Sequence, residues 1–233
     1  MMTMDQPELH SNISQVRERL SNAAKRANRP ASDIRLIAVS KTKPFEAIRY
    51  AFAAGITDFG ENYVAEGVEK RRLCSDLDIT WHFLGPVQSN KTRHIAENFD
   101  WIHSVDRLKT ASRLNAQRPV DKAPLNVCLQ VNIPYEETKS GLTTTSELVE
   151  LASAIQQLER LSLRGIMAIP PPCADPHLQR EQFKLIASLL NTDGLPNHVD
   201  ELSMGMSGDM EAAIAEGSTM VRIGTDIFGA RYT

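Results

Sequence analysis

One lysine stands where a reactive amine would be useful. Lys41 directly follows the short apolar segment 34–40, IRLIAVS, a pattern that predicts a strand buried on both faces. A deprotonated lysine amine can form a Schiff base with an aldehyde, and desolvation or a nearby positive charge favours the deprotonated form. Lys43 could supply that charge, but it precedes Pro44 and lies outside the predicted strand. Lys41 is therefore the favoured nucleophile, and a solvated lysine at a strand end is the alternative.

Two glycine-containing loops near the C-terminus could bind a phosphate. Gly205, Ser207 and Gly208 precede a predicted helix, and Gly224 and Thr225 follow the last predicted strand. Glycines let backbone amides approach an anion closely, hydroxyls donate hydrogen bonds, and a helix N-terminus adds its dipole. Ordinary turn chemistry is the alternative for each loop alone. The two loops together favour a phosphate site.

Arg222 adds a permanent positive charge beside these loops, two residues before Gly224. An ion pair at the rim of the sheet is the alternative role. An amine on one side and a phosphate site on the other suggest pyridoxal 5′-phosphate, whose aldehyde would meet Lys41. An arginine at the pyridine nitrogen would keep that nitrogen unprotonated and would weaken the ring as an electron sink.

The remaining strand ends carry few groups of other chemistries. Their side chains belong to Asn62, His82, Ser104, Asn132, Met167 and Ser203. These residues include no pair of carboxylates of the kind that hydrolyses glycosides and no cluster with metal-ligand spacing. No arrangement of serine, histidine and aspartate typical of acyl transfer is evident either.

The elements that must position these residues alternate along the chain. Eight segments have the composition of short strands: 34–40, 56–60, 79–85, 100–105, 123–133, 161–169, 198–205 and 218–224. Helical patterns separate them, which predicts parallel strands joined by right-handed crossovers. Eight such units in about 200 residues predict a (β/α)8 barrel of the TIM type. An open doubly wound sheet is the alternative, weakened because no GxGxxG follows the first strand.

The boundaries of three helices can also be predicted. Residues 1–30 read as an additional N-terminal helix, with Ser11 or Asn12 capping its start. Asp106 is expected to cap the helix after the fourth strand, and the last strand has no predicted helix behind it. With no linker or break in composition, the chain is expected to form one domain, with the barrel over 34–231.

Composition excludes several classes of protein. The 233 residues carry 26 basic and 29 acidic side chains, a net charge of −3 that offers no broad surface for nucleic acid. No apolar run approaches the roughly 18 residues of a membrane span, and the N-terminus is too polar for a secretory signal. The three cysteines are scattered and form no CxxC pair. A reducing cytoplasm is the expected compartment.

Six motifs together resemble the pyridoxal phosphate homeostasis protein family. They are AVSKTKP (38–44), FGENYVAEG (59–67), WHFLGPVQSNK (81–91), RGIMAIP (164–170), LSMGMSGDMEAAI (202–214) and VRIGTDIFGAR (221–231). Their order matches the family over nearly the whole chain. The resemblance implies a single barrel like the N-terminal domain of alanine racemase, with pyridoxal 5′-phosphate as coenzyme.

The resemblance also implies roles for individual residues. Lys41 would hold the coenzyme as a covalent aldimine, and Arg222 would face the pyridine nitrogen. Ser203, Ser207 and the Gly224–Thr225 pair would surround the phosphate. Further candidate contacts with the coenzyme, without an assigned role, are Asn62, His82 and Met167. The motifs assign no role to Gln88, Lys91 and Lys139.

For function, the resemblance implies binding and delivery of the coenzyme within the cell, to apoenzymes that need it, with no firmly attached reaction. Racemases add a second domain that supplies a tyrosine base, whereas here the chain ends eight residues after Thr225. A small racemase or lyase dependent on the coenzyme is the alternative, and an aldolase-like Schiff base with a sugar phosphate is a third possibility. Because the racemase dimer depends on that second domain, a monomer is expected.

Overall fold

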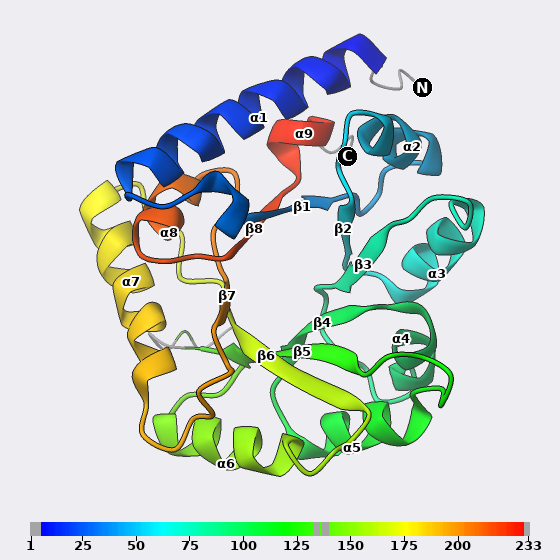
Figure 1. Ribbon diagram of the computed structural model, residues 1–233, viewed down its shortest axis with the longest axis vertical. Coiled ribbons are helices and arrows are strands. Elements are labelled where there is room, and N and C mark those ends of the chain that lie inside the picture. The colour runs from blue at the N-terminus through cyan, green and yellow to red at the C-terminus, as the bar shows by residue number, and fades with distance from the viewer. Residues whose placement is uncertain (1–5, 133–135, 137–139, 231–233) are drawn as a thin grey trace.

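The computed structural model describes residues 6–132, 136 and 140–230. Seen end-on, this part of the chain is a ring of strands surrounded by helices (Figure 1). Lys139, to which the motifs assign no role, lies outside the described residues.

Strands and helices alternate throughout the described chain. The strands are β1 (Arg35–Val39), β2 (Asp58–Glu61), β3 (Thr80–Phe83), β4 (Trp101–Val105), β5 (Leu125–Val131), β6 (Leu161–Ala168), β7 (Glu201–Ser203) and β8 (Met220–Ile223). The α-helices are α1 (Gln6–Arg26), α2 (Phe45–Ala53), α3 (Val64–Leu73), α4 (Thr92–Asn98), α5 (Leu108–Gln117), α6 (Thr145–Ile155), α7 (Pro176–Ser188), α8 (Met210–Ala215) and α9 (Thr225–Phe228). Each predicted strand is present, with its ends moved by up to three residues.

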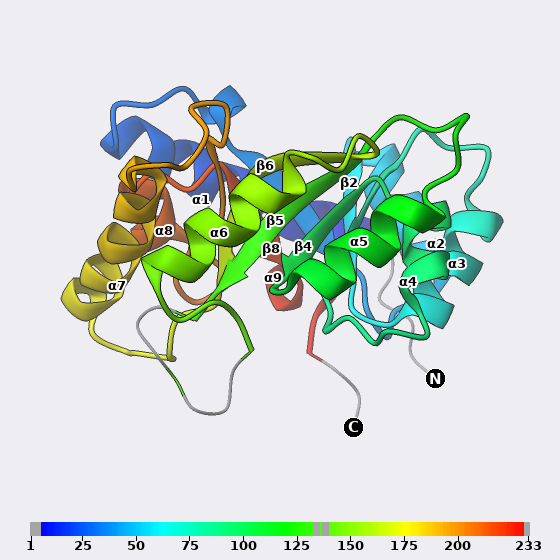
Figure 2. The same cartoon turned by 90° about the horizontal axis from the view of Figure 1, so that it is seen from below.

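The sheet closes into a barrel in chain order. Every neighbouring pair of strands is parallel, and β1 pairs with both β2 and β8. This closure confirms the predicted (β/α)8 barrel and shows that the open doubly wound alternative is wrong. In a parallel barrel all carboxyl ends of the strands open on one mouth, so the loops after the strands collect there. Figure 2 shows the barrel from the side, with α9 on the side toward which β5 points.

Side chains fill the inside of the barrel. Ile37, Trp101, Cys128, Met167 and Met220 form one buried cluster, to which five different strands contribute. A second and larger core lies between the strands and the surrounding helices. Among the described residues no helix is long and apolar enough to cross a membrane, and no three side chains are grouped as metal ligands.

The additional N-terminal helix is present as α1, which packs over α8, α9 and α2 (Figure 1). Its buried face consists of Leu9, Ile13, Val16, Leu20, Ala23 and Ala24. The predicted cap at Ser11 or Asn12 is wrong, because α1 already includes Gln6. Instead, the Asn12 side-chain amide donates to the Ile227 carbonyl at 3.2 Å, which ties α1 to α9.

Two other predicted helix boundaries differ from the structure. Arg107, not Asp106, occupies the N-cap of α5, and no side chain caps that helix. Asp106 instead lies 3.1 Å from the Arg107 guanidinium, as an ion pair between neighbours. The last strand does have a helix behind it, since the four-residue α9 follows β8 directly.

Candidate functional site

Lys41 lies in the turn between β1 and α2, and its side chain is half-buried. The following residue, Thr42, has a φ of 64°, so the chain bends sharply at this point. The Lys43 ammonium donates to the carbonyls of Gly229 and Ala230 at 3.3 and 3.1 Å. Lys43 therefore holds the segment after α9, and the assignment of Lys41 as the reactive amine stays a prediction.

A buried ionic cluster fixes the end of β1 just before Lys41. The Lys70 ammonium donates to Glu61 Oε1 at 2.8 Å, to Glu66 Oε1 at 2.6 Å and to the Ser40 carbonyl at 2.7 Å. The Ser40 hydroxyl donates to the same Glu61 oxygen at 2.6 Å, and the Thr42 amide donates to Glu66 at 2.6 Å. These bonds hold the backbone on both sides of the lysine that the sequence singles out.

The electrostatics of this cluster depend on burial. Glu61 is fully buried and Lys70 is 5% exposed. Burial raises the pKa of Glu61, while the ammonium of Lys70 and the Ser40 hydroxyl oppose that shift. Glu61 lies inside one of the family motifs, yet sequence reasoning did not select it. A glutamate at the end of a short strand has no pattern that distinguishes a buried ion pair from a solvated side chain.

The two candidate phosphate loops follow β7 and β8, as expected. Gly205 has a φ of 95° and leads into a turn in which the Asp209 carboxylate accepts from the Met206 amide at 2.5 Å. Among the described residues, the hydroxyls of Ser207 and Thr225 donate no hydrogen bond within the protein. Helices α8 and α9 have only six and four residues, so loop amides and hydroxyls, more than helix dipoles, must bind an anion here.

One arginine of the N-terminal helix connects these two loops. The Arg19 guanidinium donates to the Ser207 carbonyl at 3.0 Å, to Glu211 of α8 at 2.8 Å and to Asp226 of α9. Sequence reasoning missed Arg19, because an arginine on the polar side of an amphipathic helix looks like a solvated residue. The additional helix therefore fixes the relative position of the two loops.

Arg222 is buried on β8, with 5% of its surface exposed. Its guanidinium donates to Ser203 Oγ at 2.7 Å and to the Ala168 carbonyl at 3.0 Å. Burial lowers the pKa of Arg222 to about 10, and negative charge at Asp209 opposes the shift. No carboxylate of the described residues forms an ion pair with it, so the alternative of a rim ion pair is not supported.

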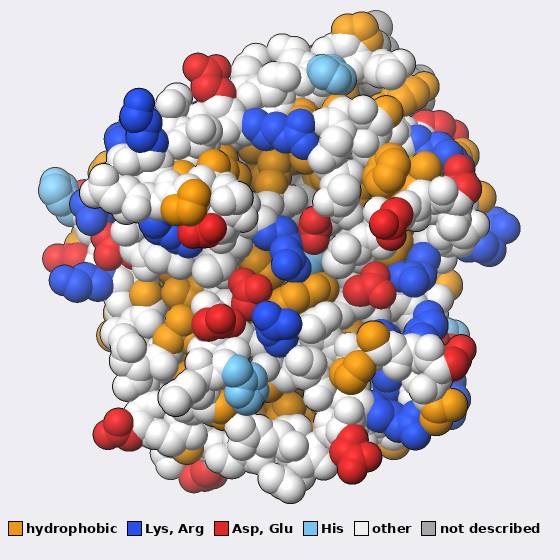
Figure 3. Space-filling view, in the orientation of Figure 1, with side chains coloured by type: hydrophobic (Ala, Val, Ile, Leu, Met, Phe, Trp, Pro, Cys, Tyr) orange, Lys and Arg blue, Asp and Glu red, His pale blue; other side chains and the backbone are white. Residues whose placement is uncertain are grey.

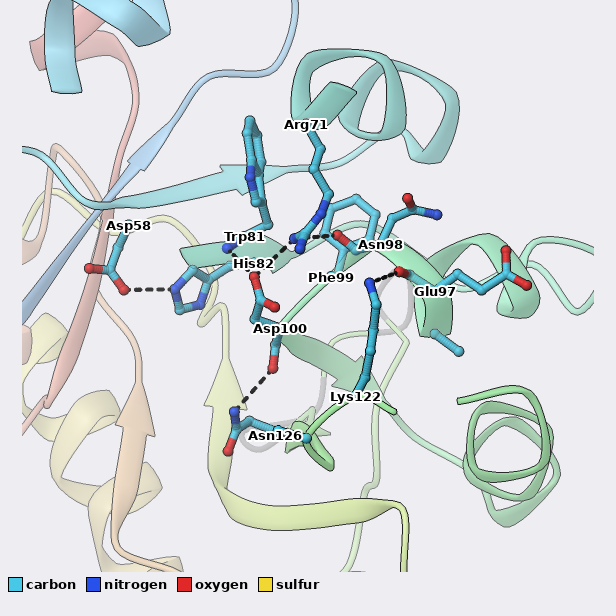
Figure 4. Close-up of polar contacts among 12 residues, drawn as sticks. Asp58, Arg71, Trp81, His82, Glu97, Asn98, Phe99, Asp100, Lys122 and Asn126 are labelled. Atoms are coloured by element: carbon cyan, nitrogen blue, oxygen red, sulfur yellow. Dashed lines mark hydrogen bonds and ion pairs between the residues drawn. The ribbon is translucent and has the colours of Figure 1, made fainter. Parts of the chain in front are cut away.

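His82 is not at the mouth, where the sequence placed it. Its side chain is completely buried inside the barrel, and both ring nitrogens have partners. Nε2 lies 3.0 Å from Asp58 Oδ1, and Nδ1 lies 3.0 Å from His103 Nε2. Figure 4 shows the Asp58 and His82 side chains pointing toward one another. His103 Nδ1 in turn lies 2.7 Å from Ser203 Oγ.

Other predicted strand-end residues have structural partners. The Ser104 hydroxyl donates to the Gly85 carbonyl at 2.6 Å, and Asn132 exchanges hydrogen bonds with the backbone of Glu136. Met167 is 2% exposed and belongs to the apolar cluster inside the barrel. Asn62 follows β2 and is half-buried. Its carbonyl lies only 2.1 Å from where a Cβ at Gly85 would be, so only glycine fits there.

The buried histidines predict a loss of stability in mild acid. Burial lowers the pKa of His82, although the hydrogen bond that His82 donates to Asp58 opposes this shift. Burial lowers the pKa of His103 further, and the nearby His82 and Arg222 add to that shift. The unfolded chain therefore takes up protons below about pH 6.5 that the folded protein does not. The free energy of unfolding should fall there by up to about 1.4 kcal/mol per pH unit for each histidine.

Urea unfolding at a series of pH values measures this dependence. His103→Asn should reduce the slope, whereas a substitution of the exposed His177, such as His177→Gln, should leave it unchanged. An unfolding free energy that is constant between about pH 7.5 and pH 5.5 would show that the buried histidines titrate normally.

The geometry thus brings an amine, two loops with free hydroxyl donors and a buried guanidinium to one end of the barrel. Comparisons with known proteins identify the family to which this barrel belongs. Residues 11–232 match the family model described as alanine racemase, N-terminal domain. A pyridoxal phosphate homeostasis protein of Pseudomonas aeruginosa is 54% identical over 220 residues, covering 94% of each chain. Its counterpart in Escherichia coli K12 is 54% identical over 230 residues, covering 96% of this chain and 97% of the relative.

Solved structures show the same relationship. PipY of Synechococcus elongatus, whose structure has PLP bound, is 39% identical with a TM-score of 0.77, covering 92% of this chain and all of the other. An alanine racemase of Clostridium difficile shares the fold at 19% identity with a TM-score of 0.68; the match covers 97% of this chain and 58% of the racemase. The chain therefore belongs to the family of pyridoxal phosphate homeostasis proteins, whose barrel has the fold of the alanine racemase N-terminal domain.

Proposed function

We propose that this protein binds pyridoxal 5′-phosphate through Lys41 and supplies it to enzymes that need it, without catalysing a robust reaction of its own. The observation that carries the proposal is the buried Arg222, which has no carboxylate partner in the described structure and shares its end of the barrel with Lys41. The names of the relatives and the PLP-bound PipY structure support the same ligand.

The residues present fit this coenzyme. The Lys41 amine would form a Schiff base with the aldehyde, and an aldehyde held in this way is protected from other amines in the cell. Ser207 and Thr225 have hydroxyls that can donate to the phosphate, with Gly224 allowing close approach. The Arg222 guanidinium, donating only to Ser203 and a carbonyl, keeps N–H groups for the ring nitrogen. When bound, the coenzyme would supply an electron-accepting ring, which a donor at its nitrogen weakens.

Delivery can be tested directly. The reconstituted protein is mixed with an apoenzyme that requires the coenzyme, and recovery of that enzyme's activity is followed while a phosphatase destroys any free coenzyme. Transfer that is faster than release into solution supports delivery. If the apoenzyme's activity never recovers faster than the coenzyme is released into solution, the function would be limited to storage.

The hydroxyls of the two loops are expected to set the affinity. Removing a hydroxyl donor to a charged group costs about 1.5–3 kcal/mol, so Ser207→Ala or Thr225→Val should weaken binding by roughly ten- to a hundredfold. Fluorescence titration measures the change, and the absorption band near 420 nm should persist at saturation because the Schiff base is intact. Equal affinity for pyridoxal and its phosphate ester would contradict this assignment.

The protein is expected to exchange the Cα proton of amino acids slowly or not at all. Racemisation needs an acid and a base on opposite faces of Cα. Tyr50 and Tyr63, on or beside the outer helices α2 and α3, are 40% and 56% exposed, and His82 has both nitrogens occupied. None of these three is placed to serve as the second base that a small racemase requires.

NMR of L-alanine and other amino acids in D2O with the reconstituted protein measures this exchange. Exchange with inversion at about 1 s⁻¹ or faster, the lower range of ordinary enzymes, would favour the enzyme alternative. A protein that stays colourless with added coenzyme would instead favour the aldolase-like alternative with a sugar phosphate. We also propose a cytoplasmic monomer, which sedimentation with and without coenzyme tests.

A further inference from the structure

A chain of hydrogen bonds crosses the inside of the barrel from one charged group to another. It begins at Arg222 and passes through Ser203 and His103 to His82, and it ends at Asp58. The four steps measure 2.7, 2.7, 3.0 and 3.0 Å. Arg222, Ser203, His103 and His82 are all at most 5% exposed, so water does not compete for these bonds.

The two ends of this chain fix the position of every proton in it. A guanidinium can only donate, so Ser203 Oγ accepts from Arg222. With both histidines neutral, the carboxylate at Asp58 makes Ser203 the donor to His103 Nδ1. His103 must then carry its proton on Nε2 and donate it to His82 Nδ1. His82 also carries its proton on Nε2, and it donates to the Asp58 carboxylate, which can only accept. Both histidines are neutral in this arrangement, and no donor faces another donor.

Independent observations support the state of the Asp58 end. Although burial opposes it, the hydrogen bond from His82 lowers the pKa of Asp58, which keeps this carboxylate an acceptor. Arg35 lies 3.7 Å from Asp58 and stacks over the ring of Trp101 at 5.0 Å. Asp58 and Arg35 begin their strands, so they lie at the end of the barrel opposite to Lys41. Figure 3 shows basic and acidic side chains together over the middle of that face.

We propose that Asp58, His82, His103 and Ser203 are positioning residues that hold Arg222 in the orientation in which it meets the coenzyme ring. The buried guanidinium has no direct carboxylate partner, and the chain of three intervening side chains leads from it to the Asp58 carboxylate. Polarised chains of this kind are stronger than their separate bonds. The proposal rests on the proposed function, and it gives Ser203 a role toward the ring in place of the phosphate contact that the family motif implies.

The protonation pattern can be tested on the protein without coenzyme, by long-range ¹H–¹⁵N NMR of the histidine rings at about pH 7.5. The expected result is that His82 and His103 are both neutral with the proton on Nε2. A charged ring, or a proton on Nδ1 of either residue, would overturn the proposal. This measurement does not depend on whether the protein binds the coenzyme, so the two proposals can fail separately.

The role of Ser203 is tested by comparing pyridoxal with pyridoxal 5′-phosphate. Ser203→Ala should weaken binding of both compounds by the same factor, roughly three- to tenfold, because it acts on the ring through Arg222. Ser203→Thr keeps the hydroxyl and should restore both affinities. Ser207→Ala, as a matched control, should weaken only the phosphate ester. A loss in Ser203→Ala that is confined to the ester would place Ser203 at the phosphate and contradict the proposal.

The Asp58 end of the hydrogen-bonded chain has a matched control in Asp100, the residue before β4. Asp58→Asn removes the carboxylate acceptor of His82 and should change the ring signals of both His82 and His103. Asp100 is a half-buried carboxylate directly before β4, and it accepts from the Trp81 amide at 2.9 Å and from Arg71 at 3.1 Å, as Figure 4 shows. Asp100→Asn should leave the His103 signals unchanged. Equal changes in the His103 ring signals of Asp58→Asn and Asp100→Asn would mean that Asp58 acts only on stability, which would contradict its role as a positioning residue.

Discussion

Replacing Lys41 with alanine is expected to abolish covalent attachment of the coenzyme. Borohydride reduces a Schiff base to a stable secondary amine, so the wild-type protein should retain coenzyme after denaturation and the variant should not. Some reversible binding should remain in Lys41→Ala, because the loops with Ser207 and Thr225 and the buried Arg222 are unchanged. Absorption and mass spectra of the reduced proteins measure both effects.

Lys43→Ala is the matched control for this experiment. Lys43 donates to the carbonyls of Gly229 and Ala230, so its loss should loosen the segment after α9 and weaken binding without preventing attachment. Undiminished attachment in Lys41→Ala, with its loss in Lys43→Ala, would reverse the assignment of the two lysines.

Lys70→Met is expected to be the most destabilising single substitution among those considered. It would leave the fully buried Glu61 without its cation, and removing one partner of a buried ion pair costs about 3–5 kcal/mol. The Ser40 carbonyl and Glu66 would also lose a donor, so the turn that carries Lys41 should become less ordered. Urea unfolding measures the stability, and coenzyme titration measures the effect on the site.

Two further variants separate charge from packing in this result. Arg72→Met, on the same helix, removes an exposed pair with Glu69 and should leave the free energy of unfolding nearly unchanged. The double variant Lys70→Met with Glu61→Leu removes both buried charges and should recover much of the lost stability. If the double variant were as unstable as Lys70→Met, packing and not the orphaned carboxylate would be the cause.

The architecture could be predicted from the sequence because buried parallel strands have a simple signature. Segments such as 34–40 and 123–133 are nearly continuous apolar runs, and helical patterns of ordinary length separate them. The length of the strand predicted over 198–205 was the most overestimated, because only Glu201–Ser203 forms a regular strand. Helix caps were less predictable, because Asp106 and Asn12 have side chains that can bond several partners equally well.

The residues of the candidate site could be located from the sequence only where they lie in the loops at the mouth of the barrel. Lys41, Ser207 and Thr225 lie in loops that follow strands, so position in the chain is enough to place them at the mouth, and their roles toward a ligand stay predictions. His103 was missed, although the alternation of β4 would have placed it beside His82 inside the barrel. Its partner Ser203 lies 100 residues away in sequence, and only the stagger of a closed barrel determines that contact. Side chains that act across the barrel cannot be paired from local patterns.

The most direct measurement of the central claim is peptide mapping of the wild-type protein after incubation with pyridoxal 5′-phosphate and reduction with borohydride. Mass spectrometry of the digest reports which lysine carries the pyridoxyl group. The account predicts a single modified site at Lys41, formed at stoichiometric coenzyme, while Lys43, Lys70 and the surface lysines remain unmodified. Modification spread over surface lysines, or none at Lys41, would contradict the claim that this barrel holds the coenzyme through that residue.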